Sequence, residues 1–306
     1  MKINLITLSI IGLTATQAAN ASPINFNSSS ISANASLGVL SGQSDEYIYN
    51  PNTGHRNSEL NWKIKHTAII KGELFWDALP YLTLNTRGWF ASPSNSGKMD
   101  DYDWTNPNQS KWTHYSHHEN TKLNSANEFD INLKGWILKQ PNYKLGGVLG
   151  YQQTKFSWVA KGGRAIYQNK SSEFENKPVI TYKQKFSTPY MGLAGQYRYQ
   201  NFEFNALLKF SPWVQARDTD EHILRNETYK AKINKSRYYS IAVDAGYYIT
   251  PSVKVFSELS WNKFANNKKG DLNVTDHSNR RSDTYNNVGG MSNTSYTISA
   301  GVQYRF

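Results

Sequence analysis

The sequence predicts an all-β fold, a ten-stranded antiparallel transmembrane β-barrel with long extracellular loops. Three observations lead to this prediction: segments in which apolar and polar residues alternate, aromatic residues near the ends of these segments, and short turns that alternate with long polar stretches. The chain has 306 residues, with 20 Tyr, 13 Phe and 9 Trp but no Cys. The absence of cysteine excludes a disulfide framework, thiolate catalysis and cysteine-ligated metal sites.

The first element is an N-terminal export signal. Lys2 precedes a short apolar run at 5–13, and Ala19-Asn20-Ala21 places small residues at a cleavage point. This order is typical of a secretory signal peptide. We therefore expect residues 1–21 to be removed and residues 22–306 to form a single domain. Beyond the signal, no run approaches the ~18 consecutive apolar residues of a helical membrane span.

Alternating segments then recur along the chain. Residues 202–210 place Phe, Phe, Ala, Leu and Phe on one face, and residues 253–261 and 296–306 alternate in the same way. Successive side chains of a strand point to opposite faces, so each segment has an apolar and a polar face. A soluble β-sandwich would alternate too. Segments of about nine to eleven residues with outward aromatics favour a membrane barrel. The terminal Phe306 resembles the assembly signal of bacterial outer-membrane barrels.

Short turns and long polar stretches give the strand count. Proline or asparagine sets four tight turns, at 79–81, 140–142, 200–201 and 250–252. Five polar stretches separate them, at roughly 43–58, 91–124, 160–181, 212–236 and 265–292. Because such barrels place short turns in the periplasm and long loops outside, this pattern predicts ten strands. Ten strands leave an interior filled largely by side chains, so function is expected at the outer rim and not in a pore.

Two of the predicted loops carry acidic residues at alternating positions. Asp101 and Asp103 are two residues apart, and Asp218, Asp220 and His222 follow one another at the same spacing. On an extended segment each set shares one face. Histidine takes up a proton near neutral pH, and a neighbouring carboxylate orients its ring. The pattern is suited to the activation of water, and solvated loop acids are the alternative interpretation.

Several longer motifs occur in order along the chain. They are Met-Asp-Asp-Tyr-Asp-Trp at 99–104, the segment 127–136, Trp-Val at 213–214 and Asp-Glu-His at 220–222, with shorter matches at 36–38, 40–42 and 245–248. In these motifs the mature chain resembles the omptin family of outer-membrane proteases over essentially its whole length. The resemblance implies an endopeptidase site in the extracellular mouth of a ten-stranded barrel in the bacterial outer membrane.

The resemblance also implies roles for four residues. Asp101 and Asp103 correspond to the catalytic aspartate couple, and Asp220 with His222 corresponds to the Asp–His dyad. In this family, water held between couple and dyad is the nucleophile, without an acyl-enzyme and without a metal. His222 would be the general base and Asp220 would orient it, while the couple positions water and stabilises the tetrahedral intermediate.

The expected substrates are peptides and surface-exposed proteins, cut at Arg or Lys residues. The family prefers bonds between basic residues, and its acidic pocket for the side chain before the scissile bond corresponds to Glu46 and Asp218. Two carboxylates hold a guanidinium through charge-assisted, bidentate hydrogen bonds, which gives a physical reason for this preference.

Lipopolysaccharide is the implied activating lipid, and no other cofactor is expected. Lys155 and Lys185 stand where the family has phosphate-binding arginines, whereas Asn234 and Gln153 depart from the family pattern. Contacts with the lipid phosphates would account for part of the excess of basic residues, which gives the chain a formal net charge of +11. No nucleic-acid partner is expected. Ordinary solvated lysines are the alternative interpretation of both positions.

Three neighbouring histidines, His114, His117 and His118, suggest a metal site. No His-Glu-x-x-His motif follows, since His118-Glu119 runs into Asn120-Thr121-Lys122. We therefore expect no metal. The family often has an acidic residue in place of His114, which makes this position a candidate for tuning substrate charge preference or pH response.

Two other classes of protein compete with a protease. An outer-membrane adhesin would bind host proteins through the same loops without proteolysis, but the chain retains all four catalytic and both pocket residues. A lipid-modifying barrel enzyme would need a Ser–His arrangement near the lipid interface, and none stands out.

Overall fold

The computed structural model describes residue 27 and residues 30–106, 108–167 and 170–306. The predicted signal peptide, 1–21, lies outside them. Strands make up nearly all of the described chain, and no α-helix occurs in it. None of these residues accordingly belongs to a helix long and apolar enough to cross a membrane.

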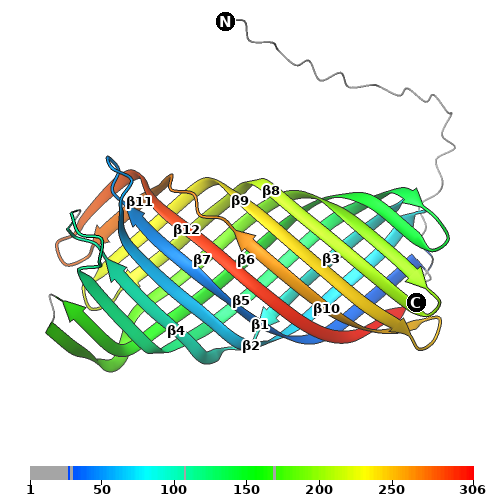
Figure 1. Cartoon of the computed structure of the whole chain (residues 1–306), viewed down its shortest axis with the longest axis horizontal. Coiled ribbons are helices and arrows are strands. Elements are labelled where there is room, and N and C mark those ends of the chain that lie inside the picture. The colour runs from blue at the N-terminus through cyan, green and yellow to red at the C-terminus, as the bar shows by residue number, and fades with distance from the viewer. Residues whose placement is uncertain (1–26, 28–29, 107, 168–169) are drawn as a thin grey trace, which may run out of the picture.

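Twelve strands form one continuous antiparallel sheet (Figure 1). They are β1 (Ile31–Tyr49), β2 (Arg56–Leu79), β3 (Leu82–Ala91), β4 (Ser94–Asp103), β5 (His114–Lys139), β6 (Tyr143–Tyr167), β7 (Lys170–Tyr199), β8 (Phe202–His222), β9 (Glu227–Tyr248), β10 (Val253–Phe264), β11 (Gly270–Asp276) and β12 (Arg281–Arg305). Strand β4 continues the path of β3, and β11 continues that of β10. The twelve segments therefore make a ring of ten strands, as predicted.

Pairing of the first strand on both sides closes the barrel. Strand β1 pairs with β12 along one edge and with β2 along the other. The break between β3 and β4 falls at Ser92-Pro93, and proline has no backbone N–H to give to a ladder. Closure leaves no free sheet edge, which is the condition for a sheet to span a bilayer.

The polar stretches differ from their prediction in one respect. They project at one end of the barrel, but largely as strand hairpins: β1 continues to Tyr49, β6 to Tyr167 and β8 to His222. Eight of the twelve described strands run 19–30 residues, because they continue beyond the alternating segments of nine to eleven residues seen in the sequence. We call this end the hairpin end. The four predicted tight turns lie at the opposite end, with the C-terminus.

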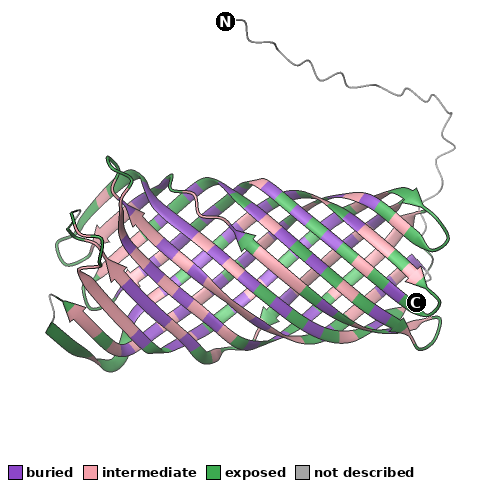
Figure 2. Ribbon diagram, in the orientation of Figure 1, coloured by how far each residue is buried: buried purple, intermediate pink, exposed green. Residues whose placement is uncertain are grey.

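The outer wall is apolar between the two ends. Buried and exposed residues alternate along the strands in Figure 2. Leu37, Ile70 and Phe90 point outward with 65–70% of their surface exposed. Exposed aromatic residues, among them Tyr199 and Phe306, gather near the short turns. This is the apolar band and aromatic girdle of a transmembrane barrel.

Side chains fill the interior, as predicted for ten strands. The rings of Trp62, Trp158 and Tyr182 stack with centroids 5.3–5.9 Å apart, and all three are fully buried. We call these three residues the aromatic floor, because the candidate site lies above them. Further from the hairpin end, Arg87 pairs with Glu258 at 2.9 Å and Lys209 pairs with Asp130.

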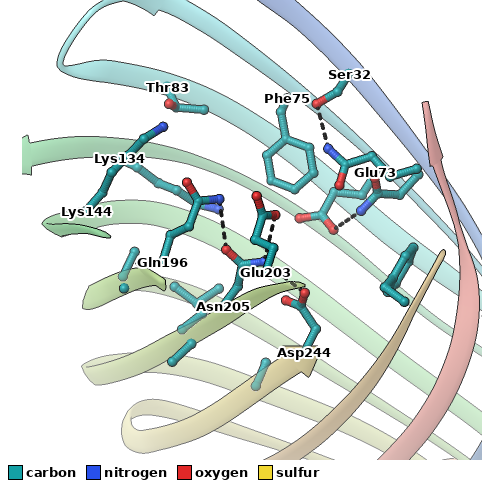
Figure 3. A pocket seen from close by; sticks show the side chains of 18 of the residues that line it. Ser32, Glu73, Phe75, Thr83, Lys134, Lys144, Gln196, Glu203, Asn205 and Asp244 are labelled. Carbon is teal, nitrogen blue, oxygen red and sulfur yellow. Dashed lines mark hydrogen bonds between the residues drawn. The ribbon is translucent and has the colours of Figure 1, made fainter. Parts of the chain in front are cut away.

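One cavity lies inside the barrel near the short turns, at the end opposite the hairpins (Figure 3). Its lining includes five acidic side chains, Glu73, Asp77, Glu203, Asp244 and Glu258, and five basic ones, Arg87, Lys134, Lys144, Lys254 and Arg305. Several are already paired, for example Lys254 with Glu203 at 2.6 Å. Because acidic and basic side chains are equal in number, the lining has no excess charge that would select a charged ligand.

Candidate active site

Strand β4 carries the predicted aspartate couple. Asp101 and Asp103 lie two positions apart near its end, so both side chains project to the same face, toward the barrel interior. Asp101 is buried, and its Oδ1 has no hydrogen-bond partner among the described residues. A buried carboxylate oxygen without a partner is costly unless a ligand satisfies it.

Strand β8 carries the predicted dyad. Nε2 of His222 lies 2.7 Å from Oδ2 of Asp220, and both side chains are buried. The short contact fixes the ring orientation and leaves Nδ1 as the second ring nitrogen. The alternation expected from the sequence is therefore present, on a strand where a loop was predicted.

The couple and the dyad face one another across a shared cavity. Asp101, Asp103 and His222 all line a cavity of about 130 Å³ at the hairpin end. In the ring of strands, β5, β6 and β7 separate β4 from β8 on one side. Side chains that are about 120 residues apart in sequence thus line the same cavity.

Burial and neighbouring charges shift the proton affinities of these groups. Burial, together with the charge of Asp103, raises the pKa of Asp101 to about 7. For His222, burial lowers the pKa, but the charge and hydrogen bond of Asp220 outweigh it and the net pKa is raised. Shifted titration of groups in one cavity is typical of a functional site.

A second acidic group lies deeper than the dyad. Glu46 on β1 is buried and its Oε2 has no partner in the described chain, while Asp218 accepts hydrogen bonds from the Ala231 amide (2.8 Å) and the Tyr182 hydroxyl (3.3 Å). Burial and then the charge of Asp220 raise the pKa of Glu46, and burial raises that of Asp218. The charge of Asp218 also raises the pKa of Glu46, so the two carboxyl groups lie close together.

The sequence of this chain is similar to those of known outer-membrane proteases. The model of the omptin family matches residues 27–306. The chain belongs to the omptin family. It is 49% identical to the plasminogen activator of Yersinia pestis over 286 residues, which cover 92% of this chain and 91% of that protein. It is 42% identical to protease 7 of Escherichia coli strain K12, with 94% of each chain covered.

Solved structures show the same relationship. The crystal structure of the outer membrane protease OmpT from Escherichia coli superimposes with a TM-score of 0.87 at 41% identity, covering 90% of this chain and 96% of that one. The resemblance predicted from the sequence motifs is confirmed. This omptin is a protease of the outer membrane, and its transmembrane barrel agrees with that location.

Of the three clustered histidines of this omptin, His114 and His118 line the same cavity, whereas His117 does not. His117 lies 2.6 Å from Asp100, and His118 is buried between Ser116 and the backbone carbonyl of Gly162. His114 lines the active-site cavity, with its ring stacked on Tyr167. In the described chain, no group of three or more His, Cys, Asp or Glu side chains is arranged to hold a metal ion.

Lys155 and Lys185 face outward on neighbouring strands. They are direct cross-strand partners, and the same register continues to Arg217 on β8 and Lys232 on β9. All four side chains are exposed. We call them the basic row. The two lysines singled out in the sequence thus belong to a longer line of four exposed cations. The sequence alone did not show that Arg217 and Lys232 lie beside them.

Two parts of the site escaped the sequence interpretation. The aromatic floor and Arg225, which lines the cavity, lie within or beside segments that were predicted as loops. The signal for the floor was present, because Trp158 and Tyr182 lie at the ends of the predicted strands that border the polar stretch 160–181, in step with the alternation of those strands. Nothing in the sequence marked Arg225, which lies in the turn between β8 and β9.

Proposed function

We propose that this protease cleaves peptide bonds by direct attack of water, activated by His222 and Asp220 and positioned by Asp101 and Asp103. The observation that carries the proposal is the cavity lined by both aspartates of the couple and by a histidine held 2.7 Å from Asp220. Water in this cavity can contact a base on one side and carboxyl groups on the other, which is the arrangement that general-base catalysis needs.

The bonds and protons balance without a covalent enzyme intermediate. Water oxygen attacks the carbonyl carbon while one water proton moves to Nδ1 of neutral His222, and Asp220 stabilises the imidazolium. The same proton then passes to the departing amine as the C–N bond breaks. Because the pKa of Asp101 is raised to about 7, its carboxyl group can hold a proton near neutral pH and donate a hydrogen bond to the developing oxyanion.

The residue before the scissile bond is proposed to be Arg or Lys, held by Glu46 and Asp218. Both carboxyl groups are buried, and Glu46 has an oxygen without a partner in the described chain. A guanidinium would satisfy these oxygens and lower the cost of ionising both acids side by side. Peptides and surface-exposed proteins with an accessible basic residue are the corresponding substrates.

Lipopolysaccharide is the proposed activating lipid, bound on the outer wall at the basic row. Four cations in cross-strand register repel one another, because directly opposed like charges destabilise a sheet. Phosphate groups of a lipid lying against β6–β9 would relieve this repulsion, as lysine and arginine bind phosphate well. Lys155 and Lys185 are the central residues of this proposal.

The active site is proposed to face the extracellular side. Barrels of this class place short turns in the periplasm and their longer hairpins outside, and the cavity lies at the hairpin end. Substrates would then reach the site without entering the barrel.

A cleavage assay tests the proposed function. The full mature chain, refolded in detergent with and without lipopolysaccharide, is given internally quenched peptides with Arg, Lys or norleucine before a single cleavable bond. We expect hydrolysis of the Arg and Lys peptides that depends on the lipid and is unaffected by chelators. Binding of the peptides without any hydrolysis would favour an adhesin instead.

A further inference from the structure

The catalytic cavity extends along the barrel wall on the side away from Glu46. Between the couple on β4 and the dyad on β8, the ring of strands runs through β5, β6 and β7 on one side. On the other side it runs through β1, which carries Glu46, and β12. A peptide that places a basic side chain toward Glu46 therefore directs its next residue toward β5–β7.

The part of this wall formed by β6 and β7 is largely apolar. Among the described lining residues, these two strands contribute Ala165, Ile166, Tyr167, Phe174, Val179 and Ile180, and the turn after β8 contributes Leu224. The ring of His114 stacks on Tyr167 with centroids 4.2 Å apart, and His118 stacks on Phe174 at 5.5 Å. Both imidazoles thus present ring faces and edges to the same wall.

Among the described residues that line this cavity, none is a free carboxylate that could pair with a cationic substrate side chain. Asp101 and Asp103 are the only carboxylates among its described lining residues, and both belong to the catalytic couple. Arg225 lines the cavity as well, makes no ion pair in the described part of the chain, and feels the charges of both aspartates. His222, neutral when it accepts the water proton, adds no acid to the cavity. Arg225 therefore already supplies a counter-charge to the two aspartates within the site.

We propose that this cavity receives the side chain that follows the scissile bond, and that it selects an uncharged apolar or aromatic residue and rejects Lys and Arg. The inference rests on the proposed function and narrows it, since the family prefers a basic residue on both sides of the bond. A guest lysine or arginine would lose water next to Arg225 without gaining a free carboxylate, which is unfavourable. An apolar guest instead buries surface against the β5–β7 wall.

Competition among peptides that differ only after the cleavage site tests the inference. The mature chain, refolded with lipopolysaccharide, receives equimolar peptides with Arg before the bond and Ile, Phe, Asp, Lys or Arg after it. Mass spectrometry gives the ratio of kcat/KM values, which does not depend on the fraction of active protein. We expect Ile and Phe to exceed Lys and Arg by at least tenfold.

Two variants test the cause of the selectivity. His114→Asp adds a carboxylate to the cavity, and Arg225→Gln removes its cation. Each should raise the Arg/Ile ratio at least tenfold, while the preference for Arg before the bond stays intact. Arg280→Gln, in the turn between β11 and β12, removes an arginine that does not line the cavity and should leave the ratio unchanged.

The outcomes separate this inference from the function on which it rests. If none of the peptides is cleaved, the proposed specificity for a preceding arginine fails, and the inference falls with it. If all are cleaved but Lys or Arg after the bond is accepted as well as Ile, the function stands and the inference is overturned. Equal ratios in the wild type, His114→Asp and Arg225→Gln would also overturn it.

Discussion

Asp100 and Asp101 are consecutive on β4 and serve opposite faces of the barrel wall. Asp100 accepts a hydrogen bond from the Tyr115 hydroxyl (2.9 Å) and lies 2.6 Å from Nδ1 of His117, whereas Asp101 lines the cavity of the candidate active site. A shift of register by one residue would exchange the two faces. The outer contacts of Asp100 therefore help to keep Asp101 inside.

The first prediction compares these neighbours. Asp101→Asn removes a carboxyl group of the couple and should lower kcat/KM by at least ~100-fold, the range for a lost acid–base group. Asp100→Asn keeps the shape of the side chain and can still accept hydrogen bonds on the outer face, so we expect less than a tenfold loss. Steady-state assays of both variants, at matched refolded fraction, check this contrast. Similar losses in the two variants would contradict the assignment of Asp101.

The second prediction concerns pH dependence. His222 must be neutral to accept a proton from water, so kcat/KM should rise with pH through the raised pKa of His222. Asp220→Asn removes the charge that raises this pKa, and the acidic limb should therefore move to lower pH. The same variant should be at least ~100-fold slower, because the ring loses its orientation.

Profiles of kcat/KM between pH 4 and 9 for both proteins check this prediction. His55→Gln, at the exposed connection between β1 and β2, provides a histidine control whose profile should match the wild type. A limb that stays in place in Asp220→Asn, or moves to higher pH, would show that His222 is not the titrating base.

The third prediction addresses the acidic pocket. Hydrogen bonds to charged groups contribute about 1.5–3 kcal/mol each. Glu46→Gln combined with Asp218→Asn removes both charges and should therefore reduce the preference for Arg over norleucine before the bond by at least ~100-fold. The ratio of kcat/KM values for the two peptides is the measurement. A double variant that keeps its preference for Arg would place the basic side chain elsewhere.

Particular residues show what the sequence could and could not predict. Alternation at 202–210 and 296–306 predicts the apolar outer face, because the bilayer makes that face uniform. The strand continues through Asp218, Asp220 and His222, where polar residues lie on both faces, and the ladder hydrogen bonds that hold it there leave no mark in hydropathy. Arg225 was missed since a turn residue acquires its role only from the strands that meet around it.

The fourth prediction tests the basic row. Lys155→Ala with Lys185→Ala should increase the lipopolysaccharide concentration needed for half-maximal activity, since two of the four charges of the basic row are removed. Activity at saturating lipid should approach that of the wild type, because neither residue lines the cavity. Lys263→Ala, an exposed lysine on β10 away from the row, is the matched control. An unchanged lipid requirement in the double variant would exclude these lysines from the lipid site.

The fifth prediction links stability to the pocket through the aromatic floor. Trp62 is fully buried and stacks on Tyr182 at 5.3 Å, and the Tyr182 hydroxyl donates to Asp218. Trp62→Ala opens a cavity and should lower the free energy of unfolding by about 3–5 kcal/mol. Trp62→Phe should cost less, because the indole N–H has no partner in the described chain and only ring area is lost.

Trp62→Ala should also weaken substrate binding, because Tyr182 donates a hydrogen bond to Asp218 of the acidic pocket. Loss of the stacked ring frees Tyr182 to move, so Trp62→Ala should raise KM for a peptide with Arg before the bond more than it lowers kcat. Urea unfolding in detergent micelles and steady-state kinetics measure the two effects. Ile137→Ala, which shortens an outward side chain that is 80% exposed, should change neither by much. If Trp62→Ala unfolds more easily but binds its substrates as the wild type does, the floor supports the barrel alone and Tyr182 does not position Asp218.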